Sequence, residues 1–174
     1  TEFSSIVKPP APHPEVFDLA RLVRDITREL QGENLIGRDI AVDDALPDAL
    51  WAHGDMIQTR QALRHVVANA AEAMEEGGLL QFSSVVEDGQ TRICIEDSGT
   101  GLEDVDLERV FQPFFSTKPA STGLGLSIAR GLLRASGGDL MLETPPSAER
   151  TQPAQRGARV KVHLPHPAAA AQSN

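Results

Sequence analysis

The sequence predicts an α/β fold: a two-layer sandwich with helices packed on one face of a mixed, mostly antiparallel sheet. Helical apolar spacing and strand-like alternation follow one another in the order helix, strand, helix, hairpin, helix, hairpin. A strong hairpin signal at residues 87–90 favours antiparallel pairing. The length of 174 residues suits one domain with a sizeable core. We place that domain at residues 15–165.

Residues 1–14 are predicted to be a linker, and a helix follows them. The run from Lys8 to Pro14 is rich in proline, which lacks the backbone donor that a helix interior needs. Asp18 then offers an N-cap. Apolar residues recur at helical spacing from there to about Gly32, namely Leu19, Leu22, Val23, Ile26 and Leu30. Residues 40–42 alternate as a short strand.

A second helix is predicted from Asp55, its N-cap, to about Glu76, where two glycines end it. Its apolar stripe includes Leu63, Val66, Val67 and Ala70. At about 100° per residue, Asn69 falls on the flank of this stripe, beside the positions of His65 and Ala73. A polar group on the flank of a buried face can look into a pocket.

The second half of the chain alternates strands with one helix. Residues 79–86 and 91–96 are predicted strands, and the second delivers Asp97 at its end. Residues 98–122 show no long periodic pattern, and we expect most of them, from residue 102, to form a lid. A helix is predicted from Gly123 to Gly137, followed by strands around residues 140–142 and 158–164. The tail, residues 166–174, is expected to be disordered.

Composition narrows the classes of function. The net charge of -9 and a pI near 5.0 argue against a nucleic-acid partner, which requires clustered basic residues. No apolar run is long enough to span a membrane, so no membrane contact is expected for this chain. The single cysteine, Cys94, suits a reducing compartment, and we expect a cytoplasmic location. Because the chain begins at Thr1, it reads as part of a longer protein that could carry a membrane anchor elsewhere.

Two glycine motifs point to a nucleotide pocket. The first is Asp97-Ser98-Gly99-Thr100-Gly101-Leu102, and the second is Thr122-Gly123-Leu124-Gly125-Leu126. A carboxylate at Asp97 can accept a hydrogen bond from an exocyclic amine such as that of adenine. The glycines allow close approach of backbone to a flat ring, and a helix that begins near Gly123 offers free N–H groups to phosphates. Asn69 supplies an amide oxygen suited to Mg²⁺.

Each of these features taken alone has an ordinary structural explanation, such as a turn, a helix start or an exposed charge. Thr117 and Lys118 belong to the segment between the motifs, from which they could reach a γ-phosphate. The combined order and spacing of the features indicate a site, because chance rarely assembles all of them.

The four segments that carry these features resemble the conserved boxes of sensor histidine kinases. Residues 61–74 resemble the N box, 97–102 the G1 box, 111–118 the F box and 122–126 the G2 box. The short lid and the run Pro113–Lys118 are most similar to the nitrogen-regulatory, NtrB/NtrY-like branch. The resemblance implies a Bergerat fold of the GHKL superfamily, shared with gyrase, Hsp90 and MutL ATPases.

The resemblance also implies cofactors and residue roles. ATP and Mg²⁺ would be bound, with Asn69 as the metal ligand, Asp97 on the adenine amine, and Gly99 and Gly101 along the base. Asn69 and Lys118 would be the catalytic residues. The remaining nucleotide-binding positions would be Ala73, Leu102, Thr117, Thr122, Gly123, Leu124, Gly125 and Leu126.

The reaction implied is transfer of the ATP γ-phosphoryl group to a histidine on a separate dimerisation domain. None of the five histidines of the chain has the flanking residues of a phosphoacceptor. We therefore expect the acceptor helices to lie elsewhere in the parent protein, with residues 1–14 as the junction. The expected partners are those helices and a response regulator. The chain alone is expected to bind ATP without phosphorylating itself.

Two other functions remain open. The family pattern is altered at three positions: His65 replaces a common asparagine or glutamate, Glu72 a common basic residue, and Ser121 a common glycine. These departures would suit a degenerate GHKL module that binds nucleotide or a protein partner without kinase activity. The same pocket would also serve a serine kinase of the anti-sigma type. A missing carboxylate at position 65 counts against an ATP hydrolase.

Overall fold

The computed structural model describes residues 11–101, 109–112, 125–146 and 157–172. Its larger sheet contains β2 (Ile40–Asp44), β4 (Gly78–Glu87), β5 (Gln90–Asp97), β6 (Asp139–Glu143) and β7 (Ala158–Pro165), in the order β2-β4-β5-β7-β6. The pair β2 and β4 is parallel, and the other neighbours are antiparallel.

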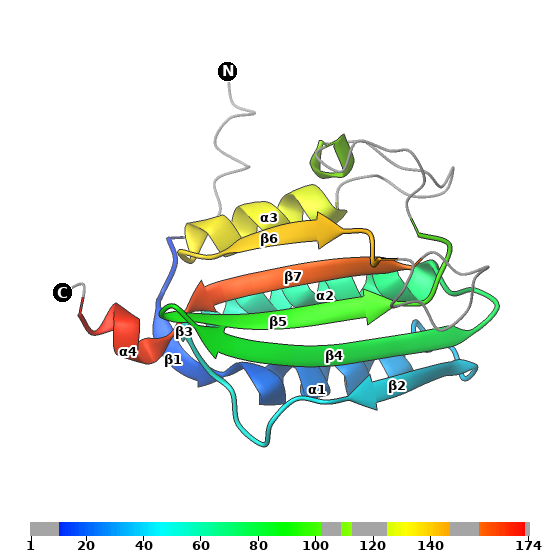
Figure 1. The fold of residues 1–174 in the computed structure, drawn as a ribbon, viewed down its shortest axis with the longest axis horizontal. Helices are drawn as coiled ribbons and strands as arrows, with labels where there is room; N and C mark the ends of the chain where they lie inside the picture. The colour runs from blue at the N-terminus through cyan, green and yellow to red at the C-terminus, as the bar shows by residue number, and fades with distance from the viewer. Residues whose placement is uncertain (1–10, 102–108, 113–124, 147–156, 173–174) are drawn as a thin grey trace.

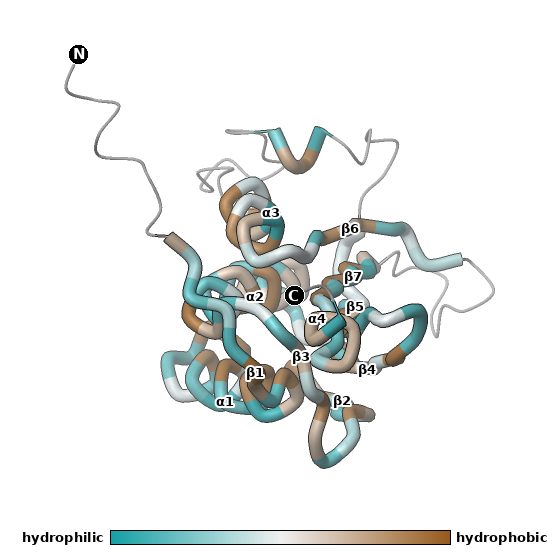
Figure 2. Tube along the Cα trace, turned by 90° about the vertical axis from the view of Figure 1, so that its left-hand side faces the viewer, coloured by the Kyte–Doolittle hydropathy of each residue, from teal (hydrophilic) through white to brown (hydrophobic). Residues whose placement is uncertain are grey.

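Three helices cover one face of this sheet: α1 (Leu19–Gly32), α2 (Met56–Glu72) and α3 (Gly125–Ala135) (Figures 1 and 2). Helix α2 lies between the other two and packs against β5, while α3 packs against β6. The predicted class, a mixed and mostly antiparallel sheet with helices on one face, is confirmed.

Aspartate caps begin the first two helices, as the sequence predicts. The Asp18 side chain accepts hydrogen bonds from the backbone N–H groups of Ala20, at 3.1 Å, and Arg21, at 3.3 Å. The Asp55 side chain accepts from the N–H of Gln58 at 2.9 Å. Both helices also bury their predicted apolar stripes. The cap therefore sets where each helix begins, and the stripe sets which face is buried.

The predicted hairpin joins β4 and β5 through Asp88 and Gly89. Both residues have positive φ, 50° and 70°, as a type I′ turn requires. Strand β5 pairs with β4 on one side and β7 on the other, and its residues alternate between buried and half-buried. This alternation places Asp97 on the helix-facing side of the sheet, at the end of a strand held on both edges.

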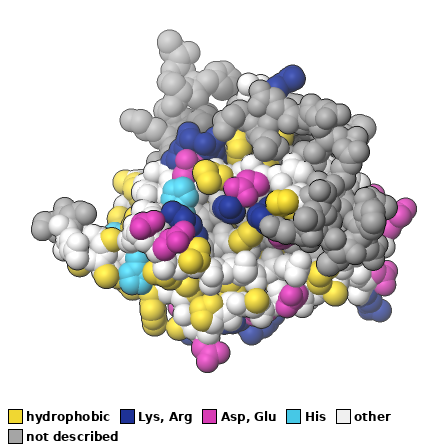
Figure 3. Space-filling view, in the orientation of Figure 1, with side chains coloured by type: hydrophobic (Ala, Val, Ile, Leu, Met, Phe, Trp, Pro, Cys, Tyr) yellow, Lys and Arg dark blue, Asp and Glu magenta, His cyan; other side chains and the backbone are white. Residues whose placement is uncertain are grey.

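The opposite face of the sheet carries ion pairs between neighbouring strands. Arg159 Nε lies 2.9 Å from Glu96 Oε2, and Lys161 Nζ lies 2.9 Å from Glu143 Oε1. Figure 3 shows acidic and basic side chains interspersed on the face seen in Figure 1. Mixed charges of this kind keep the uncovered face of an antiparallel sheet in contact with water.

Four elements differ from the sequence prediction. The strands β1 (Glu15–Asp18) and β3 (Trp51–Gly54) form a separate two-stranded antiparallel sheet that was not predicted. Helix α2 ends at Glu72, short of the expected Glu76. Between β5 and α3 a single 3₁₀ turn, η2 (Arg109–Phe111), is described.

The expected disorder of residues 166–174 is wrong for residues 166–172, which the structure describes as a capped turn of helix, α4 (Pro167–Ala170). His166 Nδ1 accepts from the Ala168 N–H at 3.3 Å, and the backbone N–H of His166 donates to the Gly89 carbonyl at 2.9 Å. Proline at the first helical position followed by alanines favours a helix. Across the described ranges, no helix is both long and apolar enough to cross a membrane.

Candidate functional site

Asp97 lies where β5 ends, between the start of β4 and the start of β7. Its partners across the sheet are Leu80 and Ala158. The residue is only 7% exposed, and its Oδ1 accepts a hydrogen bond from the Gly99 N–H at 2.9 Å. This turn closes tightly after the strand and holds the carboxylate at the helix-facing edge of the sheet.

Gly99 brings the first glycine motif against the end of α2. A Cβ at Gly99 would lie 2.4 Å from the carbonyl oxygen of Ala73, so only glycine fits there. The neighbouring Thr100 N–H donates to the same Ala73 oxygen at 3.2 Å. Two residues on, Gly101 has a φ of 68°, which favours glycine. Asp97, Gly99 and Ala73, three of the predicted site residues, are therefore neighbours.

Gly125 brings the second glycine motif beside Asn69. A Cβ at Gly125 would lie 3.7 Å from both Asn69 Oδ1 and Asn69 Nδ2, and 3.7 Å from His65 Nδ1. The first turn of α3 therefore faces the polar flank of α2, one helical turn before Ala73. Leu126 is half-buried and packs against the core. Because Gly125 carries no side chain, the first residue of α3 places no side chain beside the Asn69 amide.

His65 lies one turn before Asn69 on the same flank of α2. Burial lowers the pKa of its imidazole, and the positive charge of Arg64 lowers it further. At neutral pH the ring is therefore uncharged, with one nitrogen that donates and one that accepts.

The central part of the candidate site is thus a polar strip along the second half of α2. Asn69 lies opposite Gly125, and Ala73 lies opposite Gly99. Among the described residues, no group of three His, Cys, Asp or Glu side chains is placed to hold a metal ion. An amide oxygen at Asn69 fits Mg²⁺, which keeps several waters and takes its other ligands from substrate phosphates.

Six predicted site residues lie outside the described residues: Leu102, Thr117, Lys118, Thr122, Gly123 and Leu124. The same holds for nearly all of the predicted lid, although η2 falls within it. In η2, Phe111 packs against the core, and the Arg130 guanidinium lies 4.6 Å from the centre of its ring.

Sequence reasoning missed two residues that shape the site. The Ser98 hydroxyl accepts from the Leu79 N–H at 2.8 Å and so fixes the turn after β5 to the start of β4. Gly157, with a φ of 60°, donates its N–H to the Gly99 carbonyl at 3.0 Å. A Cβ at Gly157 would lie 2.3 Å from the Asp97 carbonyl oxygen. A lone glycine just before a strand was the signal that could have identified it.

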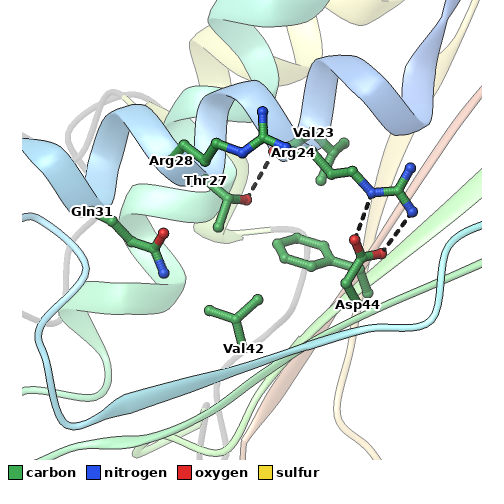
Figure 4. A pocket seen from close by; sticks show the side chains of 8 residues that line it. Val23, Arg24, Thr27, Arg28, Gln31, Val42 and Asp44 are labelled. Atoms are coloured by element: carbon green, nitrogen blue, oxygen red, sulfur yellow. Dashed lines mark hydrogen bonds and ion pairs between the residues drawn. The ribbon is translucent and has the colours of Figure 1, made fainter.

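A separate pocket of about 290 Å³ lies between α1 and the β2–β4 edge of the sheet (Figure 4). Val23, Val42 and Phe82 supply its apolar lining. Its charged groups have partners already: Arg24 lies 2.6 Å from Asp44, and Arg28 lies 3.2 Å from Asp25. None of the predicted site residues line this pocket, so it is not part of the candidate site.

Comparison with known proteins places the chain in a family. Residues 54–168 match the family described as histidine kinase-, DNA gyrase B- and HSP90-like ATPase. The sensor kinase CckA of Brucella abortus is 33% identical over 72% of this chain and 15% of its own length. The nitrogen regulation protein NtrY of Azorhizobium caulinodans is 29% identical over 94% of this chain and 21% of its own length. The chain therefore spans a small part of these curated relatives.

Solved structures agree in fold. The catalytic domain of the histidine kinase ThkA has a TM-score of 0.72 and 26% identity, over 88% of this chain and 96% of that domain. The mycobacterial sensor histidine kinase MprB has a TM-score of 0.76 at 22% identity, over 88% of this chain and 98% of that one. Together with the family match across most of the domain, these similarities show that the chain belongs to the histidine kinase-, gyrase- and Hsp90-like ATPase family.

Proposed function

We propose that this chain is the ATP-binding catalytic domain of a sensor histidine kinase. The observation that carries the proposal is the polar strip on α2, where both glycine motifs converge: Gly99 meets Ala73, and Gly125 meets Asn69. This arrangement would place an acceptor for a purine base, Asp97 at the end of β5, and an oxygen ligand for a metal, Asn69, beside the same helix. The family match supports nucleotide binding.

In the proposed complex the adenine amine donates a hydrogen bond to the Asp97 carboxylate. The backbone around Gly99 and Gly101 approaches the base, with Ala73 beside it. The triphosphate extends along α2 toward the beginning of α3, where the positive end of the helix dipole favours an anion. We assign Leu102 and Thr122–Leu126 to this lining.

Asn69 would hold Mg²⁺ through its amide oxygen, and a bound Mg²⁺ would supply positive charge that favours phosphoryl transfer. We assign Thr117 and Lys118 to the γ-phosphate. A nitrogen of the acceptor histidine attacks the γ-phosphorus, the bond from phosphorus to the β–γ bridging oxygen breaks, and ADP leaves with that electron pair. Positioning of the two reactants supplies much of the acceleration.

The proposed partners are the dimerisation helices of the parent protein and a response regulator. A solved structure of ThkA in complex with the response regulator TrrA shows that related kinase binding such a partner. For this chain we propose the same kind of partner and a cytoplasmic location, with any membrane anchor in another part of the parent.

A labelling experiment tests the reaction. The chain is incubated with γ-labelled ATP and Mg²⁺, first alone and then joined to the dimerisation domain of its parent. We expect no label on the chain alone, and acid-labile label on a histidine of the joined protein. Acid-stable label on a serine of a partner would instead indicate the anti-sigma type of kinase, and no label in the joined protein would contradict kinase activity.

A further inference from the structure

We propose that Asp55 is a positioning residue that couples the segment entering the domain, residues 11–14, to the nucleotide site through helix α2. The inference depends on the proposed function only for the identity of the ligand that the site binds. Its structural part is a link from the entering segment to the Asn69 flank of α2, and it is argued from contacts of the described residues.

The two carboxylate oxygens of Asp55 have different partners. Oδ1 accepts from the Gln58 N–H at 2.9 Å and caps α2, while Oδ2 accepts from the His13 N–H at 2.8 Å. Asp55 is only 6% exposed; its bond from Gln58 is buried, and its bond from His13 is partly buried. One buried side chain therefore joins the first turn of α2 to a segment 42 positions away in sequence.

The entering segment is suited to transmit a displacement. Pro12 and Pro14 flank His13, and proline has no N–H, so His13 is the single backbone donor within residues 12–14. Proline-rich segments are stiff and extended. A displacement of the chain before this segment would therefore move the His13 N–H relative to the Asp55 carboxylate, because the stiff segment cannot bend to take up the displacement.

A second attachment follows at once. Strand β1 pairs with β3 in a register that sets Glu15 opposite Gly54, the residue before Asp55. Gly54 is itself closely packed, because a Cβ there would lie 3.4 Å from Leu164 and 3.5 Å from Ser136. The entering chain is thus held to the start of α2 by a backbone pairing and a side-chain hydrogen bond.

Helix α2 carries this link to the site. Asn69 lies on the same helix, about 21 Å along the axis from Asp55 at about 1.5 Å per residue. The start of α2 also contacts the region that follows α3, since Ser136 Oγ lies 3.5 Å from Gln58 Oε1. The start of α2, to which the entering segment is bonded, therefore contacts the residue that directly follows α3, the helix that begins with Gly125.

Two substitutions remove the link and one matched substitution controls for capping. Asp55→Asn keeps an oxygen for the α2 cap but replaces the second oxygen with an NH₂ group that cannot accept from His13. His13→Pro removes the donor. Asp18→Asn is the control, because Asp18 caps α1 and accepts from Ala20, Arg21 and Leu50 with a single oxygen, Oδ1. Helix α1 carries no predicted site residue.

The readouts are the NMR signals of the Asn69 side-chain amide and the Gly125 backbone amide without nucleotide, the ATP dissociation constant, and urea unfolding. We expect both link variants to shift these two signals and to weaken ATP binding about two- to thirtyfold, the range of measured coupling effects. We expect Asp18→Asn to leave the signals and the dissociation constant unchanged.

The proposal is overturned if the Asn69 and Gly125 signals stay in place in both link variants, or if Asp18→Asn moves them equally. The signals are compared in the nucleotide-free protein. A failure of the unaltered chain to bind ATP would therefore contradict the proposed function. The NMR comparison of the Asn69 and Gly125 signals would still test whether Asp55 links the entering segment to α2.

Discussion

Alanine at Gly99 is the sharpest test of how the first glycine motif meets α2. Gly99 has an ordinary backbone conformation, so the expected cost is steric alone. The new Cβ would lie 2.4 Å from the Ala73 oxygen and 2.8 Å from the Ala73 Cβ, and the backbone must move to accept it. Overpacking of this kind costs about 1–3 kcal/mol. Loss of the hydrogen bond from Thr100 to Ala73 adds about 1 kcal/mol.

We therefore expect Gly99→Ala to lower the free energy of unfolding by about 2–4 kcal/mol, measured by urea denaturation with circular dichroism. Gly131→Ala is the matched control. Gly131 lies within α3, and a Cβ there would meet nothing within 4 Å. Alanine at that position should stabilise the protein by about 0.5–1 kcal/mol. A Gly99→Ala protein within about 0.5 kcal/mol of the unaltered one would refute the close approach.

Three further predictions concern charge, metal and core. Burial raises the pKa of Asp139, but hydrogen bonds from Arg130, the Leu140 N–H and Arg134 outweigh it and lower the pKa from 3.8 to about 2. This carboxylate should therefore stabilise the fold by roughly 2 kcal/mol above pH 4 and lose that effect as the pH falls toward 2. Asp139→Asn should lack this loss of stability when its free energy of unfolding is measured against pH. Asn69→Ala should abolish the strengthening of ATP binding by Mg²⁺ while leaving the unfolding midpoint within a few degrees. An unchanged effect of Mg²⁺ on ATP binding would show that Asn69 is not the metal ligand. Leu80→Ala, at a fully buried position, should cost about 2–5 kcal/mol in urea unfolding, and a loss below 1 kcal/mol would place Leu80 outside the core.

Local chemistry made much of the fold predictable. Asp18 and Asp55 each precede an apolar stripe at helical spacing, and both proved to be caps. The pair Asp88 and Gly89 specifies a hairpin turn with positive φ at two successive positions. In the site, residue order alone placed Asp97 at a strand end and Asn69 on the flank of a buried helix face, and the structure has both there.

What the sequence did not predict depends on contacts between distant segments. The strands β1 and β3 have four residues each, too few for alternation to stand out, and their pairing depends on the packing of Phe17 and Ala52 beneath them. The strands β2 and β4 pair in parallel, which requires a crossover connection between them. No local sequence pattern indicates which strand β2 pairs with. The link between His13 and Asp55 is of the same kind, since neither residue alone indicates the other.

The prediction of disorder was wrong for residues 166–172 for a different reason. Alanine has the highest helix propensity, and His166 as the N-cap with Pro167 at the first helical position favours the start of a helix. A contact with the hairpin turn holds the tail in place, because the His166 N–H bonds to the Gly89 carbonyl at 2.9 Å. Local propensity and one distant backbone contact together decided the outcome.

Calorimetric titration of ATP with Mg²⁺ into the unaltered chain and into Asp97→Asn tests the central claim most directly. We expect binding in the micromolar-to-millimolar range for the unaltered chain and loss of that binding in the variant. The NH₂ group that replaces one carboxylate oxygen cannot accept from the adenine amine, and the oxygen that remains accepts from the Gly99 N–H. Urea unfolding of both proteins shows whether the variant keeps its fold. Equal binding by both proteins would contradict the role of Asp97, and no binding by the unaltered chain would contradict a nucleotide site between α2 and α3.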